Sequence, residues 1–344
     1  MKMMPLGRTG ISVSQICLGT MTWGEQNTQD EAHQQMNFAL DKGINFIDTA
    51  ELYAVPPRAE TYGATEEMIG NWFAANGRRE DWVLASKVAG PGRKWIREGR
   101  RLKGADVTEA LEASLKRLQT DHLDLYQIHW PNRVHYNFDR SWIFNPYAQD
   151  KERARGEMLE ILEALGRAHE AGKIRAIGLS NETSWGTMEF LRLAEAHGLP
   201  RVASIQNEYN LIRRQFDLDL AEVCFFEDVA LMAYSPLAAG ALSGKYMGGQ
   251  RPAGTRGAIG DMWRLSEHSE PVIAAYVALA REHGLDPCQM ALAWCLTRPF
   301  MSSLIIGATS MDQLAADIGA GEIVLSDEVM AGIEAIHRAH PRPI

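Results

Sequence analysis

The chain alternates between short apolar strands and amphipathic helical stretches over almost its whole length. Helix 107–118 is typical, since Val107, Ala110, Leu111 and Leu115 fall on one face. Strands that alternate with helices pair in parallel through right-handed crossovers, and eight such units predict a closed (β/α)8 barrel, or TIM barrel. The eight predicted strands are 15–18, 44–47, 82–86, 123–128, 174–179, 202–205, 229–233 and 303–306.

The barrel is expected to form one domain over residues 1–344, with an N-terminal β-hairpin at 6–13 and an extra C-terminal helix at 327–337. An open doubly wound sheet is the alternative. The barrel is preferred because no Pro/Gly/Ser-rich linker divides the chain and no G-x-G-x-x-G follows the first strand. The other predicted helices are 29–42, 65–76, 158–171, 184–197, 219–227, 271–283, 287–298 and 311–318.

Composition excludes several classes of function. A formal net charge of -9 argues against a nucleic-acid surface, although a local basic patch for a phosphorylated cofactor is compatible with it. No apolar run reaches the ~18 residues of a membrane span, and the N-terminus has no apolar signal core. The sparse cysteines Cys17, Cys224, Cys288 and Cys295 form no metal-binding spacing, so we expect a cytoplasmic protein without a metal.

Two long stretches resist regular structure, and both follow predicted strands on the C-terminal face, where barrels build their active sites. Residues 244–270 carry several basic side chains, among them Lys245 and Arg256. Residues 131–150 are rich in aromatic side chains, namely Tyr136, Phe138, Trp142, Phe144 and Tyr147.

Polar side chains end several predicted strands: Asp48 the second, Lys87 the third and His129 the fourth. Taken singly, such an Asp is more often a helix cap, such a Lys a surface charge and such a His a packed loop residue. Their joint occurrence at equivalent positions predicts that they meet at one mouth with Tyr53, because burying such a cluster without a purpose is costly.

These four side chains suit carbonyl reduction by hydride transfer, which creates an alkoxide that needs a proton. Tyr53 is a weak acid with an ordinary pKa of about 10. A neighbouring Lys87 ammonium is expected to lower that pKa, and Asp48 to keep Lys87 charged. His129 is expected to hydrogen-bond the carbonyl oxygen and orient it.

The chain resembles the aldo-keto reductase family over essentially its whole length, and within it the bacterial Tas-like reductases, a branch near the potassium-channel β subunits. The resemblance implies a tetrad of Asp48, Tyr53, Lys87 and His129, with Tyr53 as the acid. The motifs that carry it are GINFIDTAELY (43–53), ASKV (85–88), LDLYQIHWP (123–131), IGLSN (177–181), IQN (205–207), AYSPL (233–237), GKY (244–246) and GATSMDQL (307–314).

The resemblance also implies a nicotinamide cofactor across the barrel mouth, without a Rossmann domain. It implies nicotinamide-end contacts from Gly19, Thr20, Met21, Asp48, Ser180, Asn181 and Gln206, with Tyr234 stacked on the ring. Along the pyrophosphate it implies Ser235, Pro236, Leu237, Gly240 and Lys245. Around the adenosine end it implies Gly307, Thr309, Gln313 and Asp317, with Arg256 reaching in from its loop.

Some positions depart from the family pattern. Gly307 stands where many members carry Lys, no Arg lies near Gln313, and Asp317 replaces the usual Asn. Lys245 and Arg256 remain as basic partners for a phosphate, which favours NADP(H) over NADH.

The expected partner is a small carbonyl substrate, an aldehyde above all, and a homo-oligomer is compatible with the sequence. Trp23 and Trp130, beside Tyr53 and His129, are predicted to wall an apolar substrate pocket, although packing of the loops is an equally good interpretation of these aromatics. The alternative function is a nucleotide-sensing regulatory protein with little turnover, like the channel β subunits.

Overall fold

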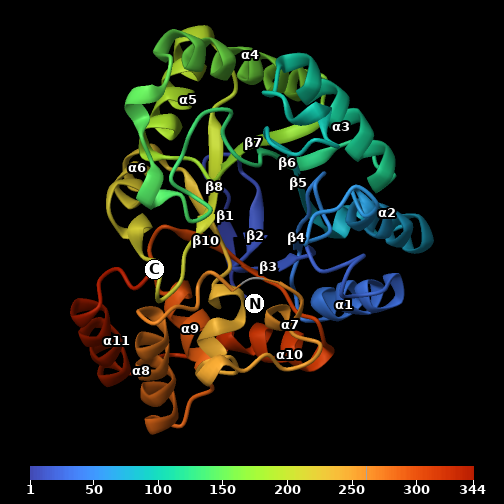
Figure 1. Ribbon diagram of the computed structural model, residues 1–344. Coiled ribbons are helices and arrows are strands. Elements are labelled where there is room, and N and C mark those ends of the chain that lie inside the picture. The colour runs from blue at the N-terminus through green and yellow to red at the C-terminus, as the bar shows by residue number, and fades with distance from the viewer. Residues whose placement is uncertain (261) are drawn as a thin grey trace.

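The computed structural model describes residues 1–260 and 262–344. Within these residues eight parallel strands close into a barrel in the order β10-β3-β4-β5-β6-β7-β8-β9, and helices surround it (Figure 1). The predicted (β/α)8 barrel is therefore confirmed. Its strands are β3 (Ile16–Gly19), β4 (Phe46–Asp48), β5 (Val83–Val88), β6 (Leu123–Ile128), β7 (Ile174–Ser180), β8 (Val202–Glu208), β9 (Ala230–Tyr234) and β10 (Met301–Ile306).

The helices mostly follow the predicted positions. Two of them, 184–197 and 219–227, match the prediction to the residue. The helices are α1 (Gln29–Asp41), α2 (Ala64–Asn76), α3 (Gly104–Leu118), α4 (Lys151–Glu170), α5 (Ser184–His197), α6 (Asp219–Glu227), α7 (Arg256–Ile259), α8 (Ser269–Glu282), α9 (Pro287–Leu296), α10 (Met311–Gly319) and α11 (Asp327–Ala339).

Helix α4 begins earlier than its apolar pattern indicates. The predicted start was residue 158, but the Asp150 side chain accepts a hydrogen bond from the amide of Arg153 and starts the helix at Lys151. The first turns of α4 are mostly exposed, so they carry no apolar period. The long stretch 244–270 contains the short helix α7, and residue 261 of that stretch lies outside the described residues.

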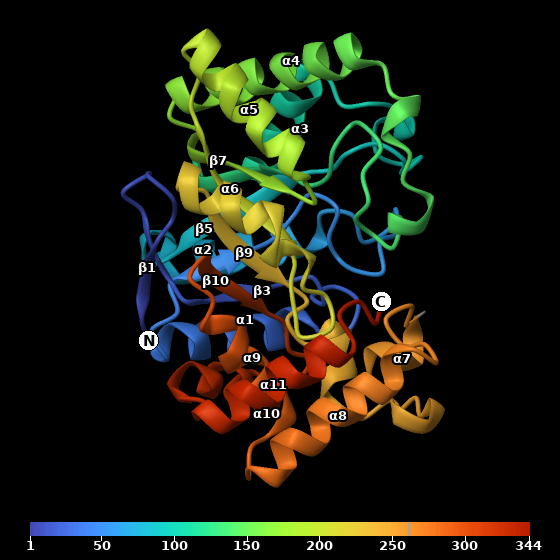
Figure 2. The ribbon, with the colours of Figure 1, turned by 90° about the vertical axis from the view of Figure 1, so that its left-hand side faces the viewer.

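The N-terminal hairpin consists of β1 (Met3–Pro5) and β2 (Ser12–Ser14), paired antiparallel. The hairpin itself is confirmed, but the prediction that its strands lie within 6–13 was wrong, because residues 6–11 form the connection. Leu6 and Val13 are fully buried in one apolar cluster with Cys17 of β3. The hairpin thus covers the end of the barrel opposite the long loops (Figure 2).

Strand register brings the polar strand ends to one level. Asp48 is the register partner of Ala85, two residues before Lys87, and Lys87 is the partner of Gln127. Residues two apart on a strand point to the same face. Asp48, Lys87 and Gln127 can therefore meet at the C-terminal end of the barrel. Among the described residues, no helix combines the length and hydropathy needed to cross a membrane.

Helix α2 approaches helix α3 closely at Gly70. A Cβ built at this glycine would lie 2.1 Å from the carbonyl oxygen of Arg117 and 2.8 Å from the carbonyl carbon of Leu118. Both neighbours are backbone atoms, so they cannot move aside as a flexible side chain does. The missing side chain is what lets the two helices touch.

We therefore expect Gly70→Ala to lower the free energy of unfolding by about 1–3 kcal/mol, through overpacking. The matched control is Gly156→Ala in α4, where no atom lies within 4 Å of the added Cβ. That change is expected to raise stability by up to about 1 kcal/mol, because alanine is the better helix former. Urea unfolding measures both, and equal stabilities for the two variants would contradict the packing argument.

Candidate active site

The ammonium group of Lys87 is the centre of the candidate site. Its side chain is fully buried. Nζ donates to Oδ2 of Asp48 at 2.6 Å, to the carbonyl oxygen of Thr49 at 2.8 Å and to the hydroxyl of Tyr53 at 3.3 Å. All three donors of the ammonium thus have oxygen partners, which is what a buried cation requires.

Asp48 is held by amides from neighbouring strands. Its Oδ1 accepts from Nε2 of Gln206 at 2.8 Å and from Nε2 of Gln127 at 3.1 Å. Gln206 was expected to bind the cofactor, and Gln127 carries no signal in the sequence that points to the site. Both now contribute to fixing the carboxylate that faces Lys87.

Tyr53 and His129 face each other beside this pair. Their ring centroids lie 5.7 Å apart with an interplanar angle of 79°, an edge-on contact. Tyr53 is partly exposed, whereas His129 is buried and its Nδ1 has no hydrogen-bond partner. The structure therefore brings all four predicted side chains together and leaves one imidazole nitrogen without a partner.

Burial and charge set the protonation states. Burial raises the pKa of Tyr53 above its ordinary value, and Lys87 only partly opposes this. Lys87 lowers this pKa as expected, but desolvation of the phenolate outweighs the attraction of the ammonium, so the net shift is upward. Burial alone would lower the pKa of Lys87, but Asp48 and Tyr53 together raise it.

Burial, and secondarily the charge of Lys87, hold the pKa of His129 well below its ordinary range. At neutral pH the site thus contains a phenol that keeps its proton, a charged ammonium and a neutral imidazole. A neutral imidazole carries one N–H donor, so it can hydrogen-bond a carbonyl oxygen without adding a second positive charge.

A second buried carboxylate, Glu51, anchors the loop that carries Tyr53. Arg97 donates to it through Nη1 at 2.6 Å and Nη2 at 3.1 Å, and the hydroxyl of Tyr62 donates at 2.6 Å. The amide of Ala89 donates at 2.7 Å. Sequence reasoning missed this role, although Glu51 lies in the same motif as Asp48 and Tyr53.

The residues predicted at the nicotinamide end form one connected network. The hydroxyl of Tyr234 donates to Oδ1 of Asn181 at 2.7 Å, and Nδ2 of Asn181 donates to the carbonyl oxygen of His129 at 2.9 Å. Ser180 Oγ donates to the carbonyl oxygen of Gln206, and Thr20 Oγ1 to that of Asp48. These side chains lie beside the tetrad, and their hydrogen bonds are to one another and to neighbouring backbone carbonyls.

Gly19 ends β3 and packs closely against β10. A Cβ at Gly19 would lie 2.6 Å from the carbonyl oxygen of Ile306. After β9, Ser235 adopts a positive φ of 51° and Gly240 one of 88°. Pro236 and Leu237 lie between them and form the turn at the end of the strand.

The two basic residues assigned to the cofactor have different charged and polar neighbours. Neither Lys245 nor Arg256 forms an ion pair with any described residue, so their charges are available to a phosphate. Nη1 of Arg256 lies 4.0 Å from Sδ of Met21, and its charge acts on Tyr53. Arg256 thus lies close to Met21 and Tyr53, and its expected contact with the adenosine end stays a prediction. The charge of Lys245 instead lowers the pKa of Asp317 in α10, against the larger effect of burial.

The adenosine-end residues surround the start of α10. Oε1 of Gln313 accepts from the amide of Thr309 at 3.0 Å and from its hydroxyl at 3.1 Å, so this side chain closes the preceding turn. A Cβ at Gly307 would meet no atom within 4 Å, which leaves open space beside it. Asp317 is buried in α10, and its charge interacts with that of Asp286.

The two tryptophans predicted to wall the substrate pocket differ in their surroundings. Trp23 has no exposed surface, and its Nε1 donates to Oε1 of Gln35 in α1 at 3.1 Å. It packs in the core, and we leave it out of the substrate wall. Trp130 lies beside His129, with ring centroids 4.9 Å apart, and contacts Phe138 edge-on.

The aromatic loop 131–150 is fixed by hydrogen bonds at its start, whereas two aromatic side chains further along it are exposed to solvent. Arg133 forms a bidentate pair with Glu182, and Nδ2 of Asn137 donates to the carbonyl oxygen of Asn181 at 2.7 Å. Trp142 and Tyr147 are 76% and 97% exposed, so they do not wall a pocket.

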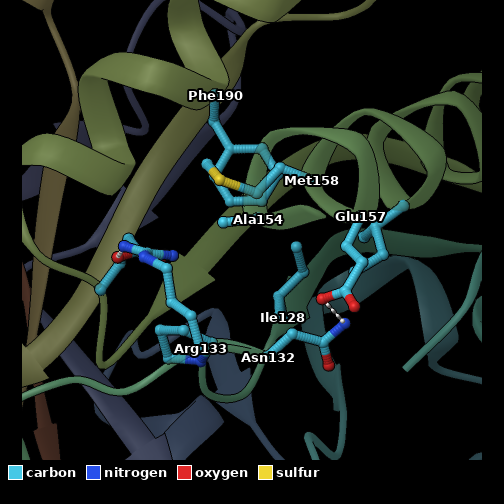
Figure 3. Close-up of a pocket in the computed structure, with 10 residues that line it drawn as sticks. Ile128, Asn132, Arg133, Ala154, Glu157, Met158 and Phe190 are labelled. Atoms are coloured by element: carbon cyan, nitrogen blue, oxygen red, sulfur yellow. Dashed lines mark hydrogen bonds and ion pairs between the residues drawn. The ribbon is translucent and has the colours of Figure 1, made fainter. Parts of the chain in front are cut away.

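A small cavity lies behind this loop, between β6, α4 and α5 (Figure 3). Ile128, Arg133, Met158 and Phe190 line it, and Asn132 hydrogen-bonds Glu157 at its edge. None of the four tetrad side chains lines this cavity. We therefore place the reacting carbonyl at the barrel mouth instead.

Comparison with known proteins agrees with this geometry. A sequence profile of the Aldo/keto reductase family matches residues 15–338. The chain belongs to the aldo/keto reductase family. It is therefore an oxidoreductase of a family that generally uses nicotinamide cofactors, usually NADP(H), and acts on small carbonyl compounds.

Three relatives span nearly the whole of this aldo/keto reductase. It is 48% identical over 343 residues to Protein tas of Escherichia coli (strain K12), covering 97% of each chain. It is 35% identical to the uncharacterized oxidoreductase YrpG of Bacillus subtilis (strain 168), covering 94% of this chain and 92% of YrpG. It is 29% identical to a probable voltage-gated potassium channel subunit beta of Oryza sativa subsp. japonica, covering 98% and 97%.

The buried carboxyl group of Asp317 makes the stability of the fold depend on pH. Burial, followed by the charge of Asp286, raises the pKa of Asp317 to about 7, with Lys245 opposing. The folded protein thus keeps this proton up to about pH 7, whereas the unfolded chain releases it near pH 3.8. Stability is therefore lost as pH rises through this window, because the unfolded state binds fewer protons.

Asp317→Asn removes this loss and keeps the side-chain shape. The free energy of unfolding of Asp317→Asn minus that of the wild type is expected to be about 2 kcal/mol larger at about pH 8.5 than at about pH 5.5. Thermal unfolding at the two pH values measures the gain. Asp312→Asn, at an exposed position of the same helix, is the control and should show no such growth. A gain for Asp317→Asn that does not change with pH would contradict the raised pKa.

Proposed function

We propose that this aldo/keto reductase catalyses the NADPH-dependent reduction of aldehydes, and of some ketones, to alcohols. The observation that supports it most directly is the bridge of Lys87 between Asp48 and Tyr53, at 2.6 Å and 3.3 Å. When bound, the nicotinamide supplies the hydride. Tyr53 donates its hydroxyl proton to the carbonyl oxygen as the alkoxide develops.

The neighbouring groups prepare Tyr53 for this step. The raised pKa of Tyr53 keeps the proton in place until a stronger base forms, and the Lys87 ammonium stabilises the tyrosinate that remains. Asp48 keeps Lys87 charged. Neutral His129 orients the carbonyl oxygen by a hydrogen bond, and it adds no charge that would compete with Lys87.

The residues present also fit a dinucleotide. Ser180, Asn181 and Gln206 supply hydroxyl and amide groups of the kind that bind a carboxamide. Lys245 and Arg256 supply cations without a carboxylate partner among the described residues, and phosphates are their natural ligands. Arg256, near Met21 and Tyr53, suits a phosphate close to the nicotinamide end.

Tyr53→Phe tests the proposal, because it removes the acid and keeps the ring. With an aromatic aldehyde and NADPH, kcat is expected to fall about 100-fold or more, the scale of general acid catalysis. NADPH absorbance gives the rate, and fluorescence titration of NADPH checks that cofactor binding survives. Equal rates for the two proteins would remove Tyr53 from the role of acid.

A second function is favoured by the similarity to a potassium channel subunit beta over almost the full chain. In that case bound nucleotide would regulate a partner, and turnover would be negligible in wild type and variant alike despite tight NADPH binding. Multiple turnovers per active site in the wild type would exclude it.

Cofactor choice is a separate prediction. NADPH is expected to give a higher kcat/KM than NADH, because Lys245, whose charge acts on Asp317 of α10 and which has no ion-pair partner among the described residues, is a cation at the end where only NADPH carries a 2′-phosphate. Lys245→Gln is expected to reduce kcat/KM for NADPH about tenfold, the scale of one charge-assisted hydrogen bond. Steady-state kinetics with both cofactors measure this. An NADH efficiency equal to or above that of NADPH would show that the basic residues do not select the cofactor.

A further inference from the structure

The loop between β5 and α3, residues 89–103, is strongly basic in an otherwise acidic protein. It contains six Lys or Arg residues and one acidic residue, Glu98, whereas the whole chain carries a net charge of -9. The basic residues are Arg93, Lys94, Arg97, Arg100, Arg101 and Lys103.

Half of these cations are committed to ion pairs. The three pairs are Arg97 with Glu51, Arg100 with Asp106, and Arg101 with Glu157. Arg93, Lys94 and Lys103 form no ion pair with any described residue, and all three are exposed. The guanidinium of Arg93 lies over the ring of Trp95, 5.7 Å from its centroid, and Trp95 is itself 41% exposed. Cations left in this state are free to attract an anion.

The turn that bears Arg93 and Lys94 is held beside the catalytic side chains. Before the turn, the carbonyl oxygen of Pro91 accepts from Nε1 of Trp130 at 3.0 Å. After it, Ile96 packs in one apolar cluster with Leu52 and Trp130. Leu52 directly precedes Tyr53 and Trp130 directly follows His129, so the turn borders the side of the mouth where these two rings meet.

This loop lies across the barrel from the proposed cofactor phosphates. In the closed ring of strands, β5 is four strands away from β9, which is the opposite side of an eight-stranded barrel. Lys245 and Arg256 follow β9, whereas Arg93 and Lys94 follow β5. One dinucleotide that runs from the tetrad toward Lys245 and α10 therefore leaves the β5 cations unused.

We infer that Arg93 and Lys94 recruit carbonyl substrates that carry a negative charge, a carboxylate or a phosphate, remote from the reacting carbonyl. The inference rests on the proposed reductase function and specifies its substrate class. Tyr53 and His129 take the carbonyl oxygen, and the anionic end of the substrate points toward the β5–α3 loop. Exposed cations act over several ångströms of water, so their effect is on capture and falls with salt.

The test compares two substrates of nearly equal shape, 4-formylbenzoate and its neutral methyl ester, with NADPH. In the wild type we expect a higher kcat/KM for the carboxylate, and we expect that advantage to shrink as KCl rises from about 20 mM to about 500 mM. In the double variant Arg93→Gln/Lys94→Gln, the carboxylate-to-ester ratio of kcat/KM is expected to fall about fivefold at low salt.

The matched control is Lys2→Gln/Lys42→Gln, which removes the same net charge. Lys42 ends α1 just before β4, and Lys2 directly precedes β1 of the hairpin, so both lie at the opposite end of the barrel. This variant should keep the wild-type ratio and its salt dependence. A fall in the control equal to that in the loop variant would overturn the inference, because overall charge would then explain the result.

The substrate assignment and the reductase function give different results when either one is wrong. Turnover of both substrates with equal efficiency in the wild type, or a ratio unchanged in Arg93→Gln/Lys94→Gln, overturns the substrate assignment and leaves the reductase function standing. Absence of turnover for both substrates, with NADPH bound, overturns the reductase function and the inference with it.

Discussion

The buried ammonium of Lys87 is the constraint on which the mouth of this barrel depends. An unpaired charge in the interior costs several kcal/mol, so the fold must bring oxygen atoms to it. Asp48 comes from the adjacent strand β4. Its register partner on β5 is Ala85, two residues before Lys87, so the side chains of Asp48 and Lys87 point to the same face of the sheet. The loop after β4 then supplies the Thr49 carbonyl and the Tyr53 hydroxyl. Satisfying this one cation therefore aligns two strands and the first turn of a loop.

The rest of the mouth divides into two sides. On the side of β7 to β10, the polar groups of Ser180, Asn181 and Tyr234 hydrogen-bond one another, and Lys245 and Arg256 form no ion pair with any described residue. On the side of β5 and β6, buried ion pairs hold the loops, Glu51 with Arg97 and Arg133 with Glu182. The first side suits a dinucleotide. The second is apolar beside His129 and basic at its rim, as a site for a small anionic carbonyl compound would be.

Much of the site could be predicted because strand ends are visible in sequence. Asp48, Lys87 and His129 each follow an apolar run, and parallel pairing brings such ends together. Glu51 and Arg97 were missed because two loop residues that pair across 46 positions share no local pattern. The place of Trp23 stayed open for a related reason: a large aromatic side chain is equally compatible with a pocket wall and with the core. Its hydrogen bond to Gln35 of α1 decides between them.

The sequence by itself determined the order and type of the barrel strands and of the main helices, because the period of apolar residues records which face of each helix or strand is buried. It also determined the family, through motifs that surround the polar strand ends. Only the tertiary structure decided the protonation of Tyr53, since that depends on how far burial outweighs the attraction of Lys87. It alone decided where Arg256 lies and which loop cations remain unpaired. Those outcomes depend on contacts between segments far apart in the chain, which form only when the barrel closes.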